Sequence, residues 1–403
     1  MLLGVRPNLN QVLQHSGQVL LVGMMRNVVP ALAASEFGVP RDSFLWLVTF
    51  VVAFGLVKGA MNFVAGRLAE QHGRRRVLLW GWLLAWPIPF MVEHSPNWSW
   101  IVAATLLLGA HQGLTWSMTQ TSVLDLTKPG QRGLVIGLNE FAGYVGVALA
   151  GIATGYAADL VAPRTALLWF GAGVIGLASL SAYWGVAESQ PWLGLHPATA
   201  NPSQEAVPTT WQVFQRMTWQ DKGMMALCQA GLVEKFVDAL VWIVWPAFLL
   251  QRGLTLANIG WVLGCYGFTW GVLQLFTGPL SDKVGRQRLN VGGMWLCGLG
   301  VALFPWGQEM SWWMGTAALS GLGMAMLYPN LSAAVVDLSS PAWRASAIGI
   351  YRFWRDVGYA FGAAGIGLMA FITGTLDSSF GFIAVCMFIS GSVLQWTGRP
   401  SAS

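Results

Sequence analysis

Long apolar stretches alternate with short polar loops along the whole chain. A membrane-spanning helix needs about 20 predominantly apolar residues, and twelve stretches approach or exceed this length. They are rich in glycine, which lets membrane helices pack closely. The pattern predicts an all-α polytopic membrane protein with twelve transmembrane helices, at about 16–34, 44–65, 77–93, 98–124, 133–158, 165–187, 223–250, 258–278, 289–306, 311–336, 345–373 and 379–397.

The composition agrees with a membrane protein. The 403 residues are 55% hydrophobic and only 10% charged, whereas soluble domains carry about 25% charged residues. The net charge of +5 does not indicate nucleic acid as a partner, because the basic residues lie in short loops between apolar stretches. The chain has no P-loop, no metal-ligand spacing and no G-x-S-x-G motif. We therefore expect no enzyme, no cofactor and no metal.

Basic residues are distributed unequally between the two sets of loops. Because positive residues favour the cytoplasmic side, the richer set and both termini are predicted to be cytoplasmic, in a multi-pass protein of the cell (inner) membrane. The richer set holds fourteen, Arg6, Arg67, Arg74, Arg75, Arg76, Lys128, Arg132, Arg216, Lys222, Lys283, Arg286, Arg288, Arg344 and Arg399, and the other holds Arg41, Arg164 and Arg252.

One loop occurs twice. The segment 66–76 recurs in altered form at 278–288, so the offset in sequence number is 212. The same offset relates Asp125 to Asp337 and Phe141 to Phe353, so the register holds across several spans. Parallel repeats of this kind are found in secondary transporters, with the substrate between the halves. We predict two pseudo-symmetric six-helix bundles, 1–190 and 222–403, joined by a polar cytoplasmic linker, 191–221.

The repeated loop resembles the loop between the second and third helices of the major facilitator superfamily. The first copy has glutamate where the family pattern has aspartate, and it lies between apolar spans as the second does. The resemblance implies an alternating-access transporter, monomeric by default, in which these loops latch the outward-facing state; a pure topology anchor is the alternative. The matching residues are Gly66, Glu70, Gly73, Arg74 and Arg75, then Gly278, Asp282, Gly285, Arg286 and Arg288. The family's proton-relay arginine and antiporter proline have no counterpart here.

Charged residues inside the predicted spans are the candidates for a central site. Each costs about 2.5–3.5 kcal/mol at the membrane centre, so we expect them to face one another or a water-filled cavity. Two pairs of opposite charge are repeat counterparts: Arg26 with Asp238, and Glu140 with Arg352. An ion pair between Arg26 and Asp238 across the halves is predicted. The full set is Arg26, Lys58, Glu140, Glu234, Lys235, Asp238, Arg352, Arg355 and Asp356; Lys235 is expected on a different helix face, in a structural role.

Arginine in such a site indicates an anionic ligand, because its planar fork binds carboxylate or phosphate with two hydrogen bonds. We expect Arg26, Arg352 and Arg355 to hold a small polar anion and Asp238 or Glu234 to carry a coupling proton. His111 is either a proton relay or a helix contact. Further cavity candidates are Gln112, Trp116, Gln120, Trp242, Trp245, Trp270, Tyr328 and Asn330.

Three alternatives stay open. The charges form permanent structural pairs; or the solute is neutral or cationic, including drug efflux, and Glu234 and Asp238 bind it; or the protein is a membrane sensor without transport.

Overall fold

The computed structural model describes residues 5–40, 43–127, 132–191, 208–340 and 343–397. Most of the predicted linker, residues 192–207, is outside this description. The same holds for Arg41, Lys128 and Arg399, and for the side chains of Arg6, Arg67, Glu70 and Arg132.

Within the described ranges the chain is helical, with no strand. Long helical segments occupy all twelve predicted stretches. In order they are α1 (Val5–Ala31), α4 (Thr49–His72), α5 (Arg74–Ala85) continued by α6 (Pro87–Glu93), α7 (Trp98–Asp125), α8 (Arg132–Leu160), α9 (Pro163–Gly185), α11 (Lys222–Gln251), α12 (Leu256–Val284), α13 (Arg286–Leu303), α14 (Met310–Leu338), α15 (Arg344–Thr373) and α16 (Ser378–Thr397). Two short helices, α2 (Ala33–Glu36) and α3 (Phe44–Leu47), precede α4.

Eight of the described helical segments are long and apolar enough to cross a membrane by themselves. The other spans fail that test for identifiable reasons. Helix α11 carries Glu234, Lys235 and Asp238 in its centre, and the third span is divided at Trp86 into α5 and α6. Helices α1 and α7 also fall outside the eight. Both line the polar interior described below.

The end of the linker is helical, where the sequence predicted only a polar connection. Helix α10 (Thr210–Gln215) begins with a capping box at Thr209 and continues as the π-helix η3 (Arg216–Gln220). Val213 and Met217, four residues apart, are buried beneath it. This amphipathic spacing, short as it is, explains why the segment folds against the bundle.

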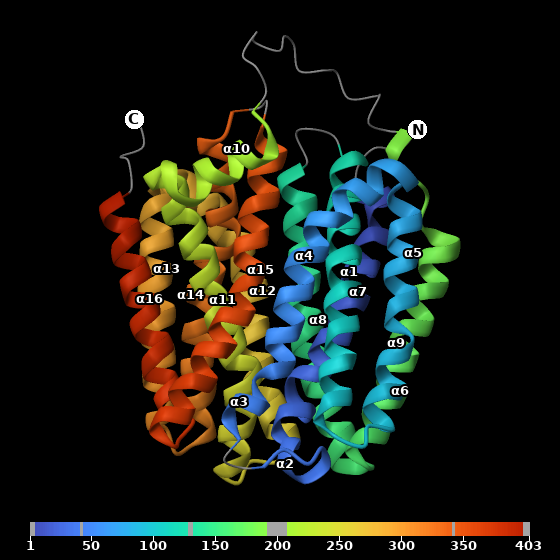
Figure 1. The fold of residues 1–403 in the computed structure, drawn as a ribbon, viewed down its shortest axis with the longest axis vertical. Helices are drawn as coiled ribbons and strands as arrows, with labels where there is room; N and C mark the ends of the chain where they lie inside the picture. The colour runs from blue at the N-terminus through green and yellow to red at the C-terminus, as the bar shows by residue number, and fades with distance from the viewer. Residues whose placement is uncertain (1–4, 41–42, 128–131, 192–207, 341–342, 398–403) are drawn as a thin grey trace.

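The helices form two groups that lie side by side (Figure 1). Helices α1 to α9 make the first group and α11 to α16 the second. They meet chiefly where α8 packs on α12, α4 on α15 and α1 on α11. Glycine permits these close crossings: a Cβ on Gly260 would lie 2.6 Å from the Gly151 carbonyl oxygen, and one on Gly55 would lie 2.7 Å from the Ala360 nitrogen.

The halves are packed together more closely at one end of the bundle than at the other. On one face of α4, Gly55 and Gly59 touch α15, whereas Gly66, two turns further on, has no neighbour within 4 Å. On α12, Gly264 and Gly271 touch α8, and Gly278 has no such neighbour. The looser end is the one where α1 begins, α16 ends and α10 lies (Figure 1). The tight end is therefore the end of α2 and α3.

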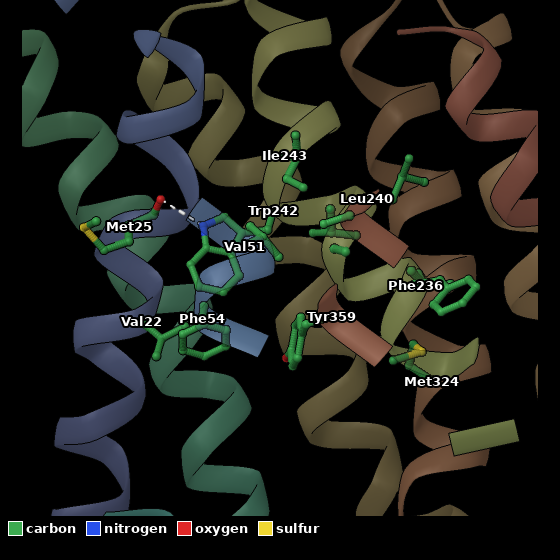
Figure 2. Packing of buried hydrophobic residues seen from close by; sticks show 14 of the residues in the cluster. Val22, Met25, Val51, Phe54, Phe236, Leu240, Trp242, Ile243, Met324 and Tyr359 are labelled. Carbon is green, nitrogen blue, oxygen red and sulfur yellow. Dashed lines mark hydrogen bonds between the residues drawn. The ribbon is translucent and has the colours of Figure 1, made fainter. Parts of the chain in front are cut away.

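An apolar cluster seals the tight end. Trp242 is fully buried and donates a hydrogen bond from its indole nitrogen to the Met25 carbonyl, 3.1 Å away (Figure 2). Its ring meets Phe54 edge-on at 4.8 Å and Phe50 at 5.6 Å. These side chains come from α1, α4 and α11. Because Trp242 lies one helical turn beyond Asp238, the cluster covers the charged residues from this side.

Candidate functional site

Asp238 is the centre of a charged cluster between the two halves. Arg26 Nη1 lies 3.4 Å from its Oδ1, and Lys235 Nζ lies 2.8 Å from its Oδ2. Two hydroxyls also donate to it, Tyr266 at 3.2 Å and Tyr359 at 2.8 Å. The contact between Arg26 and Asp238 that the repeat predicts is present. Whether it opens during transport stays a prediction.

Glu234, one turn before Asp238 on α11, is fully buried. Its carboxylate lies 3.4 Å from Arg355 Nε and 3.5 Å from Lys235 Nζ. Lys235 therefore reaches both acids, although the sequence placed it on a different helix face; its structural role stays a prediction. Its long flexible stem lets the ammonium reach the carboxylate one residue before it and the one three residues after it.

A second ion pair crosses the halves nearer the loose end. Lys58 on α4 lies 3.6 Å from Asp356 on α15, and Asn62 donates a further hydrogen bond to Asp356. The Lys58 ammonium also lies 4.8 Å from the centre of the Trp116 ring. Both charged side chains are less than a tenth exposed. This pair and the one at Asp238 link the halves electrostatically on two different helix pairs.

Glu140 and Arg352, the other repeat counterparts, are joined through an amide. The Gln120 nitrogen donates to Glu140 Oε1, and the Gln120 oxygen accepts from Arg352 Nη2. Glu140 is buried. No described basic group lies within 4 Å of its carboxylate, so it differs from Glu234, Asp238 and Asp356, which all form ion pairs.

A narrow cavity of about 20 Å³ lies among these residues. That is room for about one water molecule. Its walls come from both halves and combine four cations, one carboxylate and several aromatic rings. They include Arg26, Phe54, Lys58, Gln112, Trp116, Tyr144, Lys235, Asp238, Arg355 and Tyr359.

His111 and Gln112 have different surroundings although they are adjacent. His111 Nδ1 lies 2.8 Å from the Gly81 carbonyl, and its ring packs on Trp82, inside the first half. This is the helix contact that the sequence left open as one alternative. Gln112 lines the cavity and donates to the Gln18 carbonyl at 2.8 Å.

The two repeated loops form equivalent ion pairs, one with the end of α7 and one with the end of α14. Arg74 Nε lies 3.2 Å from Asp125 Oδ2, and Arg286 contacts Asp337, the repeat counterparts of these two residues, in the same way. Gly73 and Gly285 directly precede α5 and α13 with φ of 85° and 97°, a backbone region that favours glycine. Asp282 pairs with Arg286 at 3.1 Å. The side chain of Glu70 lies outside the described residues.

The predicted loop residues Gly66, Gly278 and Arg288 differ from these, because they lie in open surroundings. A Cβ placed on Gly66 or Gly278 would have no neighbour within 4 Å, and Arg288 is exposed. Arg75 donates through its guanidinium to the Tyr183 carbonyl. The hydrogen bonds and ion pairs of these loop residues all join residues of the same half.

Glu188 is a residue that the sequence analysis missed. It follows α9, and its carboxylate accepts hydrogen bonds from the backbone nitrogens of Arg74 at 2.9 Å and Arg75 at 3.1 Å, where α5 begins. The nitrogens of Ser189 and Gln190 also donate to it. Burial opposes its ionisation, but these four donors, that of Gln190 first, outweigh burial and lower the pKa of Glu188 below the ordinary 4.5. The sequence signal that could have identified Glu188 is the position of an acidic residue directly after a predicted span.

Tyr266, Tyr359 and Asn62 were also missed. Tyrosine and phenylalanine read alike in a hydrophobic pattern, so the hydroxyls that bind Asp238 give no periodic signal. The repeat offered a clue, because Tyr266 is the repeat counterpart of Phe54, which lacks the hydroxyl.

Two repeated helix groups around a buried charged cluster define the class of polytopic membrane transporters. The sequence model of the Major Facilitator Superfamily matches residues 16–237 and 230–403, so the chain belongs to this family, whose members are generally carriers, not enzymes.

Similar proteins agree with this assignment. An uncharacterized MFS-type transporter, STM4428 of Salmonella typhimurium, is 22% identical over 85% of this chain and 84% of its own length. The quinolone resistance protein NorA of Staphylococcus aureus is 25% identical over 40% of this chain and 42% of its own length. The crystal structure of a mutant of the nucleoside transporter NupG superimposes with a TM-score of 0.77, at 12% identity, over 98% of this chain and 100% of that one. This last likeness shows the fold alone.

Proposed function

We propose that the protein is a monomeric, alternating-access, proton-coupled transporter of a small monovalent anion in the cell inner membrane. One observation carries the proposal: the cluster between the halves, which is buried except for the half-buried Arg352, contains one more cation than carboxylates. Five basic side chains, Arg26, Lys58, Lys235, Arg352 and Arg355, face four acidic ones, Glu140, Glu234, Asp238 and Asp356. An uncompensated charge in a low-dielectric interior is costly, and a bound monovalent anion removes the excess.

The ion pairs between the halves give the transport cycle its switch. Opening the tight end requires the pairs at Arg26 and Lys58 to break, since each joins a helix of one half to a helix of the other. A substrate anion supplies a replacement partner for the freed cations, so it lowers the cost of separation. With both termini on the cytoplasmic side, as the loop charges favour, the loose end faces the cytoplasm. The moving bodies are then residues 1–190 and 222–403.

Glu140 is the best placed proton carrier. Asp238 is surrounded by two cations and two hydroxyl donors, which stabilise its ionised form. Glu140 has an amide partner instead of an ion pair. Its neutral form therefore forfeits no salt bridge when it takes up a proton. The proposal moves the carrier from Asp238 or Glu234 to this residue.

The repeated loops have a separate role in the proposal. Their glycines Gly66 and Gly278 face open space while the halves are splayed at the loose end. We expect both glycine faces to be covered by the opposite half when that end closes. The loops would then latch the outward-facing state.

Flux measurements in proteoliposomes test the function. We expect labelled monovalent anions, and not cations, to accumulate when a pH gradient is imposed. Glu140→Gln should keep anion counterflow, which needs no net proton movement, and should lose accumulation driven by the gradient. If Glu140→Gln still accumulates the anion like the wild type, the carrier assignment is wrong.

Export of a neutral or cationic compound is the second candidate, and the partial similarity to NorA favours it. Glu234 and Asp238 would then bind the substrate. Accumulation of a cation in exchange for protons, abolished by Asp238→Asn, together with no anion flux, would establish this alternative.

A further inference from the structure

The halves contact each other along two seams, α4 against α15 and α8 against α12. Repeat-equivalent positions in the two seams carry different kinds of side chain. On one side of the cavity, Lys58 of α4 forms an ion pair with Asp356 of α15. Their repeat counterparts are Trp270 of α12 and Tyr144 of α8. These two rings stack on each other with centroids 3.7 Å apart and planes 26° apart. Pseudo-symmetry thus places a charge pair at one seam and a pair of ring faces at the other.

Aromatic rings also cover the cations of the cluster. Lys235 Nζ lies 4.9 Å from the centre of the Trp270 ring, and Arg355 Cζ lies 3.8 Å from that of Tyr328. Arg26 Cζ lies 5.1 Å from Trp242. A cation within about 6 Å of a ring face is attracted to it. The charges that would hold an anion are therefore next to flat apolar surfaces.

Resting on the proposed function, we propose that the substrate is a monovalent aromatic carboxylate. When the halves separate, the stack of Tyr144 and Trp270 opens and offers two ring faces, while the pair of Lys58 and Asp356 opens and offers a cation. Both seams border the same cavity, which Lys58 and Tyr144 line together. A molecule with a planar ring and one carboxylate complements both seams at once; a small aliphatic anion satisfies only the cation.

The test compares benzoate with cyclohexanecarboxylate, which has the same charge and a similar size but no aromatic face. Uptake of each is measured in proteoliposomes containing the full-length protein at neutral pH, with protein-free liposomes subtracted. Aromatic stacking contributes up to about tenfold per ring contact. Because the open stack offers two ring faces, we expect the KM of benzoate to be about five- to a hundredfold lower than that of cyclohexanecarboxylate. This wild-type comparison depends on no variant.

Variants of one ring locate the effect. Tyr144→Leu should raise the KM of benzoate about tenfold and leave that of cyclohexanecarboxylate nearly unchanged, whereas Tyr144→Phe, which retains the ring, should keep the preference. Trp169→Leu, at a ring that is 72% exposed on α9, is the matched control and should change neither.

The outcomes separate this inference from the proposed function. Equal KM values for the two carboxylates would overturn the aromatic substrate class and leave anion transport standing. A benzoate preference that survives Tyr144→Leu would overturn the assignment of the stacked seam. Uptake of a cation with no uptake of either carboxylate would overturn both proposals.

Discussion

Breaking the ion pair of Arg26 and Asp238 is expected to have unequal consequences for its two partners. Arg26→Gln leaves Asp238 with Lys235 and two tyrosine hydroxyls, and it makes the number of cations in the cluster equal to the number of carboxylates. We expect a loss of about 1–2 kcal/mol, below the roughly 3–5 kcal/mol typical when a buried charge loses its partner.

Asp238→Asn should cost more. Arg26 would then retain a hydrogen bond to Tyr359 and the face of Trp242, and the cluster would hold two more cations than carboxylates. We expect about 3–5 kcal/mol. The double variant removes both charges and restores the original excess of one, so its cost should fall short of the sum. The predicted coupling energy is about 1–3 kcal/mol.

Equilibrium unfolding in mixed detergent micelles, with increasing dodecyl sulfate, measures these free energies. Glu36→Gln is the matched control, because its ion pair with Arg164 is a quarter to a third exposed and should contribute no more than about 1 kcal/mol. If the costs of the two single variants add up to the cost of the double variant to within about 0.5 kcal/mol, the pair contributes no energy of its own, and the predicted coupling is refuted.

Three further predictions concern packing and the repeated loops. Gly260→Ala should separate α8 from α12 and lower the free energy of unfolding by about 1–3 kcal/mol. Gly173→Ala should not, because a Cβ on Gly173 has no neighbour within 4 Å. Equal melting temperatures of the two variants would contradict this prediction. Arg74→Gln should destabilise the protein by about 3–5 kcal/mol, because its ion pair with Asp125 is buried. Arg286→Gln should cost no more than about 1 kcal/mol, because Arg286 and Asp337 are 28% and 53% exposed. A larger loss for Arg286→Gln than for Arg74→Gln would refute this prediction. Glu188→Gln should lower the free energy of unfolding by about 1 kcal/mol at neutral pH. Because the pKa of Glu188 is lowered on folding, the difference should persist down to pH 4.5 and vanish as the pH falls further. A difference that grows in acid would show that the ionised carboxylate does not stabilise the start of α5.

The fold was accessible from sequence because two independent regularities agreed. Twelve apolar stretches indicated the spans, and the constant offset between the repeats indicated the two halves. The offset also predicted the contact of Arg26 with Asp238, since pseudo-symmetry brings the first helices of the halves together. Neither regularity predicts the division of the third span at Trp86 or the helices at the end of the linker. They depend on local packing, which a hydrophobic pattern does not encode.

The charged residues of the site could be predicted from the sequence, but the groups that contact them could not. A charge inside a span is conspicuous, whereas the hydroxyl of Tyr359 is hidden in an apolar pattern. Spacing misplaced Lys235, because helix faces are defined by Cβ directions and the ammonium lies at the far end of a long stem. The amide of Gln120, although named as a cavity candidate, showed its connecting role only once Glu140 and Arg352 were placed in space.

Whether the charged cluster binds an anion decides between the two candidate functions. The dissociation constant of benzoate is measured on the purified protein by thermal shift, for the wild type and for Arg355→Gln. Arg355 lines the cavity and pairs with Glu234, and a charge-assisted hydrogen bond contributes about 1.5–3 kcal/mol. We expect the wild type to bind benzoate and the variant to bind it at least about tenfold more weakly. An unchanged dissociation constant, or stabilisation by organic cations in place of the anion, would contradict it.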